Sequence, residues 1–278
     1  MNPMKHVGIV LFASAVSVAV ASVSADSRPL IIAHRGASHD APENTLAAFR
    51  LAWEQDADGI EGDFYLTKDR RVVCIHDDTT KRTAPIDLRI ADTPFDELRK
   101  LDVGSWKDKR WAGERIPTIE EVFATVPKGK KFYVEIKCGP EIVLPIQRAL
   151  AKSGLTAQQV VIISFKEPVI AEVKRTIPGV KAIWLVAYHK DDETGQWTPT
   201  IEQIIPRLRR CKADGLGTEA RREVVNADFV RELRRAEFEF HTWTVDNPDT
   251  ARDFHSLGVE SITTNRPAFL RKHLDEDG

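Results

Sequence analysis

Short apolar runs alternate with longer amphipathic segments along most of this chain. Runs such as 30–33 and 160–164 are apolar and rich in β-branched residues, which is typical of buried parallel strands. Segments such as 45–54 and 167–176 carry apolar residues three or four positions apart, which predicts helices with one buried face. We expect Asn44 to cap the first of these helices. The alternation predicts a parallel α/β architecture.

Followed to the end of the chain, the pattern predicts eight strands that alternate with helices, apart from one extra short strand at 72–75. The strands are predicted at 30–33, 58–67, 131–137, 160–164, 182–186, 215–218, 238–245 and 261–263. The helices are predicted at 45–54, 118–125, 140–152, 167–176, 201–212, 226–235, 248–257 and 267–273. This count favours closure into a (β/α)₈ TIM barrel, a fold that commonly takes about 250 residues as one unit.

The first residues differ in composition from the rest of the chain. Lys5 precedes an uncharged stretch at 7–24, and the small residues before Asp26 suit a signal peptidase. We therefore expect a signal peptide over 1–25 and an exported barrel domain over 26–278, periplasmic or secreted. An uncleaved membrane anchor is the alternative, but the stretch is short and rich in alanine and serine for a spanning helix. We expect no membrane span after cleavage.

Charge and cysteine content narrow the choice of partners. The formal net charge is −2 and no basic block occurs, which argues against nucleic acid as a partner. Cys74, Cys138 and Cys211 fit no zinc spacing, and their odd number leaves at least one free. The first two lie in strand-like runs, where burial as small apolar residues is the ordinary explanation. The sequence alone assigns no disulfide.

Two histidines follow apolar runs in the amino-terminal half. His34 follows the run 30–33, and His76 follows the run 72–75. Catalytic side chains of parallel barrels gather at the carboxyl ends of the strands, so this is where they are expected. A pair of imidazoles can act as acid and base near neutral pH. A hydrogen-bonded structural histidine is the ordinary alternative for either residue alone.

Carboxylates and cations accompany the histidines. Glu61 and Asp63 lie two residues apart in a predicted strand, so their side chains share a face, and Glu135 lies in the next barrel strand. Inward carboxylates are costly unless paired or metal-bound, which favours a hard divalent cation. Arg35 suits either a phosphate or a salt bridge, and Lys137 could simply neutralise Glu135. Together these groups predict phosphodiester cleavage.

An ordered set of short motifs spans nearly the whole chain after the leader. In chain order the motifs are His34-Arg35-Gly36, Pro42-Glu43-Asn44-Thr45, Glu61-x-Asp63, His76-Asp77, Val134-Glu135-Ile136-Lys137, Ser164-Phe165, Trp243-Thr244-Val245, Gly258-Val259 and Thr264-Asn265-Arg266-Pro267. Each motif alone is weak, but the ordered set resembles the glycerophosphodiester phosphodiesterase family of the phosphatidylinositol phospholipase C-like superfamily.

The resemblance implies a (β/α)₈ barrel with a small insertion at about 77–115, after the second barrel strand. It also implies one bound divalent cation, Ca²⁺ or Mg²⁺. Trp243 is either an apolar wall for a glycerol group or a packed core residue. The implied catalytic residues are His34 and His76, the metal ligands Glu61, Asp63 and Glu135, and the substrate contacts Arg35, Lys137 and Trp243.

The implied reaction is hydrolysis of small glycerophosphodiesters to sn-glycerol 3-phosphate and an alcohol, through a cyclic phosphate. Which histidine first acts as the acid stays open, as do the alcohol, the cation and the oligomeric state. One alternative is a phosphodiesterase of the phospholipase type acting on lysophospholipid or phosphoinositide, for which Trp106 and Trp111 could form an apolar rim. Another is a non-catalytic phosphodiester-binding barrel, which would be expected to lack a histidine or a metal acid.

Overall fold

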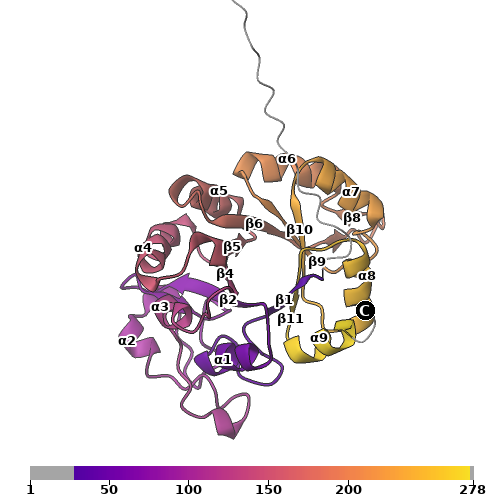
Figure 1. Ribbon diagram of the computed structural model, residues 1–278. Coiled ribbons are helices and arrows are strands. Elements are labelled where there is room, and N and C mark those ends of the chain that lie inside the picture. The colour runs from indigo at the N-terminus through magenta and orange to yellow at the C-terminus, as the bar shows by residue number, and fades with distance from the viewer. Residues whose placement is uncertain (1–27, 276–278) are drawn as a thin grey trace, which may run out of the picture.

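The computed structural model describes residues 28–275, which form a closed parallel barrel surrounded by helices (Figure 1). The ring runs β1-β2-β4-β5-β6-β9-β10-β11, and β1 pairs with both β2 and β11 to close it. The predicted (β/α)₈ barrel is confirmed. The barrel strands are β1 Leu30–Ala33, β2 Gly59–Leu66, β4 Lys131–Ile136, β5 Val160–Ser164, β6 Lys181–Val186, β9 Gly215–Glu219, β10 Glu239–Trp243 and β11 Ser261–Thr264.

Helices follow the barrel strands and lie outside the ring (Figure 1). They are α1 Leu46–Glu54, α3 Ile119–Phe123, α4 Val143–Ser153, α5 Glu167–Thr176, α6 Ile201–Cys211, α7 Ala227–Arg235, α8 Pro248–Ser256 and α9 Pro267–Asp275. The extra strand β3 Val72–Cys74 pairs antiparallel with β2, and β7 His189–Lys190 pairs antiparallel with β8 Trp197–Thr198. Single 3₁₀ turns lie at η3 Pro140–Ile142 and η4 Ala157–Gln159.

The start of α1 differs from our prediction. Thr45 is the N-cap, because its side chain accepts a hydrogen bond from the backbone N–H of Ala48. The prediction that Asn44 caps this helix is therefore wrong. Asn44 has a left-handed backbone, with φ of 59°, which turns its amide toward β2 instead.

Alternation along the strands separates the outer core from the site. On β2, Ile60 and Phe64 pack outward in the main apolar core, whereas Glu61 and Asp63 point inward. A smaller apolar cluster fills the barrel interior below the site. It contains Ile32, Tyr133, Val161, Ile163, Ile183 and Leu185.

The predicted insertion is confirmed between β3 and α3. It carries η1 Ile90–Asp92, α2 Phe95–Leu98 and η2 Lys109–Trp111. It also has an apolar core separate from that of the barrel. This small core consists of Val73, Ile75, Ile90, Leu98, Leu101, Val103 and Ile116.

Two other predictions concern the leader and the cysteines. The predicted signal peptide lies outside the described residues, so export stays a prediction. In residues 28–275, no helix has the length and apolar character needed to cross a bilayer. Cys74, Cys138 and Cys211 are all free thiols. Cys74 is buried as predicted for a small apolar residue, whereas Cys138, for which we made the same prediction, is only partly buried. Cys211, for which no burial was predicted, is buried as well.

Candidate active site

Three carboxylates from two adjacent strands converge inside the barrel. Asp63 on β2 lies opposite Glu135 on β4 in the sheet register, and Glu61 precedes Asp63 by two residues on the same face. One oxygen from each carboxylate lies within 4.8 Å of the others. All three side chains are buried, with no residue more than 8% exposed. Parallel pairing therefore concentrates negative charge at one point.

The environment of this cluster suits a cation. Burial, together with repulsion from neighbouring acids, raises the pKa of Glu61 well above its usual value and that of Glu135 to about 7. Burial also opposes ionisation of Asp63, but Arg35 and Lys137 bring its pKa below the usual value. Glu61 Oε1 and Asp63 Oδ1 are buried without a hydrogen-bond partner. Hard oxygen donors that lack a hydrogen-bond partner fit Ca²⁺ or Mg²⁺.

Arg35 and Lys137 lie at the edges of the carboxylate cluster. The backbone N–H of Arg35 donates to Glu61 Oε2 over 2.9 Å, and its side-chain Nε lies 3.2 Å from Asp63 Oδ2. Lys137 Nζ donates to Glu135 Oε1 over 2.8 Å and lies 3.4 Å from Asp63 Oδ1. Both cations also line the cavity described below, so each can contact an anionic ligand there.

A chain of polar residues orients His34. Asn265 Nδ2 donates to Asp246 Oδ2 over 2.7 Å, which directs the amide oxygen of Asn265 toward His34. His34 Nδ1 lies 2.8 Å from that oxygen, and Ser38 Oγ donates to the same atom. Because an amide oxygen only accepts, the His34 proton is held on Nδ1 and Nε2 keeps its lone pair. Burial and the charge of Arg35 lower the pKa of His34 to about 4.

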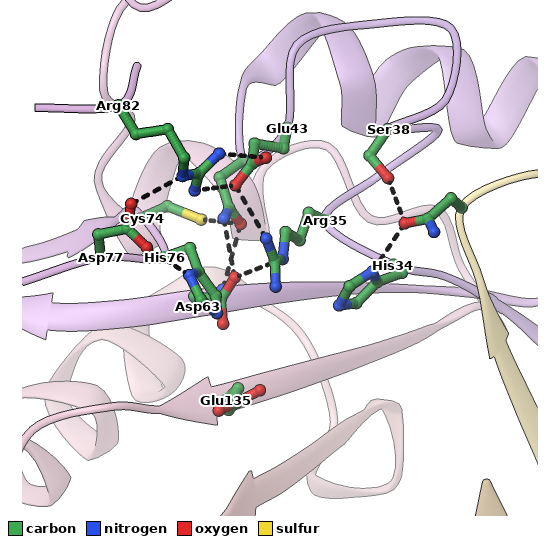
Figure 2. Close-up of polar contacts among 12 residues, drawn as sticks. His34, Arg35, Ser38, Glu43, Asp63, Cys74, His76, Asp77, Arg82 and Glu135 are labelled. Carbon is green, nitrogen blue, oxygen red and sulfur yellow. Dashed lines mark hydrogen bonds and ion pairs between the residues drawn. The ribbon is translucent and has the colours of Figure 1, made fainter. Parts of the chain in front are cut away.

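A second polar chain supports His76 (Figure 2). His76 Nδ1 lies 2.6 Å from Asp77 Oδ1, and Arg82 Nε donates to the other oxygen of Asp77 over 2.8 Å. Arg82 also donates to both oxygens of Glu43, each over 2.8 Å. Glu43 in turn accepts from Arg35 Nη1 over 3.0 Å. One guanidinium therefore links the partner of His76 to the partner of Arg35 (Figure 2).

These groups surround a cavity of about 170 Å³ at the mouth of the barrel. Phe165 and Trp243 form an apolar wall, with ring centroids 5.4 Å apart and planes nearly perpendicular. Asp63 is fully buried beside the cavity. The other predicted site residues all line it. They are His34, Arg35, Glu61, His76, Glu135, Lys137 and Trp243.

Several residues of this site were not predicted. The amide of Asn44 donates to Asp63 Oδ2 over 2.8 Å and accepts from the Asp63 backbone N–H over 3.2 Å. A usable signal existed, because Asn44 and Thr45 are both capping residues and only one of them can cap α1. Asn265 directly follows β11, where a polar side chain is expected to reach the mouth of the barrel. Nothing in the sequence marks Arg82.

Comparisons with known proteins point to one family. The model of the Glycerophosphoryl diester phosphodiesterase family matches residues 34–269. A glycerophosphodiester phosphodiesterase of Caldanaerobacter subterraneus subsp. tengcongensis is 34% identical and covers 87% of this chain and 96% of its own length. Another, from Bacillus subtilis, is 28% identical over 88% of this chain and 86% of its own length.

A similar solved structure is that of an Oleispira antarctica phosphodiesterase in complex with the product sn-glycerol-3-phosphate. It has a TM-score of 0.79 and 26% identity, and the match covers 89% of this chain and 97% of the other protein's chain. A glycerophosphodiester phosphodiesterase from Thermotoga maritima has a TM-score of 0.70 and 25% identity, and the match covers 88% of this chain and 98% of the other protein's chain. The resemblance found in the sequence is confirmed, and the chain belongs to the glycerophosphoryl diester phosphodiesterase family.

Proposed function

We propose that this protein hydrolyses glycerophosphodiesters to sn-glycerol 3-phosphate and an alcohol, with His34 and His76 as base and acid and one bound divalent cation. The observation that carries this proposal is the convergence of two oriented histidines and three carboxylates on one cavity. The product bound in the Oleispira antarctica relative supports the same class of substrate.

Hydrogen bonding supports His34 as the first base. Its Nδ1 proton is directed to Asn265, so Nε2 is free to accept a proton, and its low pKa keeps the ring neutral at pH 7. His76 is then the acid. As an imidazolium it donates through Nδ1 to Asp77 and through Nε2 to the departing alcohol.

Glu61, Asp63 and Glu135 would hold the cation, Ca²⁺ or Mg²⁺, through their carboxylate oxygens. When bound, it would supply positive charge that lowers the pKa of a substrate hydroxyl and stabilises a phosphoryl oxygen. Arg35 and Lys137 would offset the remaining negative charge on the phosphoryl group.

The proposed reaction has two steps. His34 removes the proton of the glycerol 2-hydroxyl, the freed oxygen attacks phosphorus, and the phosphorus–alkoxide bond breaks while His76 protonates the alcohol. Water then opens the cyclic phosphate: His76 takes a proton from water, and His34 returns its proton to the 2-oxygen. The cyclic intermediate follows from the resemblance to the related phospholipases. Trp243 would pack against the glycerol carbons.

We also propose that the protein acts after export, because residues 1–25 have the composition of a signal peptide. The test is the amino-terminal sequence of protein recovered from the periplasm or medium. A start at Asp26 would agree with the proposal, whereas an intact amino terminus on protein confined to the cytoplasm would refute it.

The central test is release of glycerol 3-phosphate from glycerophosphocholine with Ca²⁺, with Mg²⁺ and with EDTA. The variants His34→Ala and His76→Ala are compared with His189→Ala, which removes an exposed histidine in β7. We expect cation-dependent release that falls at least about 100-fold in the first two variants and persists in the third. Release that survives EDTA refutes the metal role. Release that survives both site substitutions refutes the histidine roles.

A further inference from the structure

A second cavity opens beside the active site at the mouth of the barrel. It has a volume of about 580 Å³ and lies between the β2–β3 turn, the insertion, and the segments that follow β4 and β5. Lys137 lines both cavities, and Lys166 of the second follows Phe165 of the active-site wall in the chain. The two cavities therefore meet on the β4–β5 side of the barrel. We call the second cavity the basic groove.

The basic groove is unusually cationic for this chain. Five of its lining side chains are basic and only two are acidic, although the whole protein has a net charge of −2. Concentrated charge of one sign in a concave surface attracts ligands of the opposite sign. The basic residues are Lys68, Arg70, Arg89, Lys137 and Lys166, and the acidic ones are Asp78 and Glu141.

Lys137 is paired with Glu135 and Asp63, but the positive charge of the other four basic side chains of the groove is only weakly neutralised. In the described part of the chain, Lys68 and Lys166 form no ion pair. Arg70 donates to the backbone carbonyl of Glu141 over 3.2 Å, a contact that leaves its charge uncompensated. Arg89 lies 3.6 Å from Asp78 Oδ2 and 3.8 Å from Asp92 Oδ2, and all three side chains are more than half exposed. Exposed lysines are ordinarily only solvated, but here they line a hollow that adjoins the site.

The position of the acid histidine indicates which end of the substrate lies nearest the groove. His76 follows β3, which pairs with β2, and Asp78, two residues later, lines the groove. Trp243 at the end of β10 lies across the ring from β4, whose end carries Lys137. A diester with its glycerol against Trp243 and its alcohol near His76 therefore directs that alcohol toward the groove.

We propose that the basic groove binds the alcohol end of substrates whose alcohol carries a further negative charge, such as a phosphate monoester or another glycerol phosphate unit. This inference rests on the proposed function and narrows its substrate class. Lysine and arginine side chains bind phosphate as charge-assisted donors. A cationic alcohol such as choline gains nothing from the groove and is repelled by it.

The test uses two diesters that differ in one group: glycerophosphoglycerol and its derivative with a phosphate on the terminal hydroxyl. The kcat/KM of the mature enzyme is measured for both at fixed free Mg²⁺. We expect the phosphorylated diester to be preferred by at least about five-fold at low salt, and the preference to shrink as salt is added. Arg89→Gln combined with Lys166→Gln should reduce this preference to about two-fold or less, with little effect on glycerophosphoglycerol.

The matched control removes the same charge elsewhere. Lys128 precedes β4 and Lys152 lies in the last turn of α4; both are exposed and away from the groove. The double variant Lys128→Gln with Lys152→Gln should keep the wild-type preference. Equal kcat/KM for the two diesters, or an equal loss of preference in both double variants, overturns the groove proposal. If neither diester is hydrolysed, the proposed function fails instead. In that case the affinities of the two diesters are measured by calorimetry. Equal affinities would overturn the groove proposal.

Discussion

Glu135→Gln is expected to stabilise the cation-free protein at neutral pH while impairing the proposed metal site. Burial and the neighbouring Asp63 raise the pKa of Glu135 from 4.5 to about 7. Below pH 4.5 the carboxyl is protonated in the folded and unfolded states alike, so its ionisation costs no stability. Between these two pKa values the unfolded chain releases the proton that the folded protein retains. Stability therefore falls as pH rises, and the loss is complete above pH 7.

The size of the loss follows from the two pKa values. Each pH unit between them corresponds to about 1.4 kcal/mol, so ionised Glu135 destabilises the folded protein by about 3 kcal/mol. Glutamine keeps the shape of the protonated acid without its charge. Lys137 loses its nearer carboxylate but keeps Asp63 Oδ1 at 3.4 Å, which makes this figure an upper bound. For a chain of this length, about 3 kcal/mol is equivalent to a rise in Tm of roughly 6–12 °C.

The assay is urea unfolding in EDTA at pH 4.5 and at pH 8. Glu223→Gln, which removes an exposed carboxylate, is the control. We expect Glu135→Gln to exceed wild type in unfolding free energy at pH 8 and to match it at pH 4.5. Added Ca²⁺ or Mg²⁺ should stabilise wild type much more than the variant. The reasoning is wrong if Glu135→Gln is less stable than wild type at pH 8 in EDTA, or if the two proteins show the same pH dependence.

Three further substitutions test the oriented groups. Asn265→Ala should lower kcat about 100-fold with little change in KM, because His34 loses the acceptor that holds its proton on Nδ1. An unchanged kcat would contradict this orienting role of Asn265. Arg82→Gln should lower kcat about ten-fold, and Arg82→Lys should lower it less, because Asp77 loses the hydrogen bond from Arg82. Separate measurement of kcat and KM checks this, and a change in KM alone would refute it. Trp243→Ala should raise KM for glycerophosphocholine about ten-fold with kcat largely kept, and an unaltered KM would mean that the indole is only a packing residue.

The barrel and the carboxylate cluster could be predicted because both depend on local rules. Side-chain alternation puts Glu61 and Asp63 on one face, and parallel register then brings Glu135 beside them. The support of the histidines depends on distant residues instead. His34 and Asn265 are 231 positions apart, so only the closure of β11 against β1 brings them together.

Other features escape prediction for different physical reasons. The role of Asn44 depends on a left-handed backbone conformation, which sequence patterns indicate poorly outside glycine. Arg82 reaches Glu43 only because of how the insertion folds over the barrel rim. The basic groove combines side chains from several separate segments, and none of these segments is a basic block.

The separate apolar core of the insertion has a consequence for the working range of the enzyme. Segments with their own packing can open as local cooperative units while the rest of a protein stays folded. Asp77 and Arg82 both lie in the insertion, whereas the carboxylate cluster belongs to the barrel. Such opening would leave an intact barrel in which His76 has lost the support of Asp77. On heating, loss of activity should then come before melting of the barrel. Local opening also predicts faster hydrogen exchange in the insertion than in the barrel strands. Exchange that is no faster in the insertion would contradict the idea. The temperature limit of catalysis would thus be set by a peripheral element, well below the limit set by the fold.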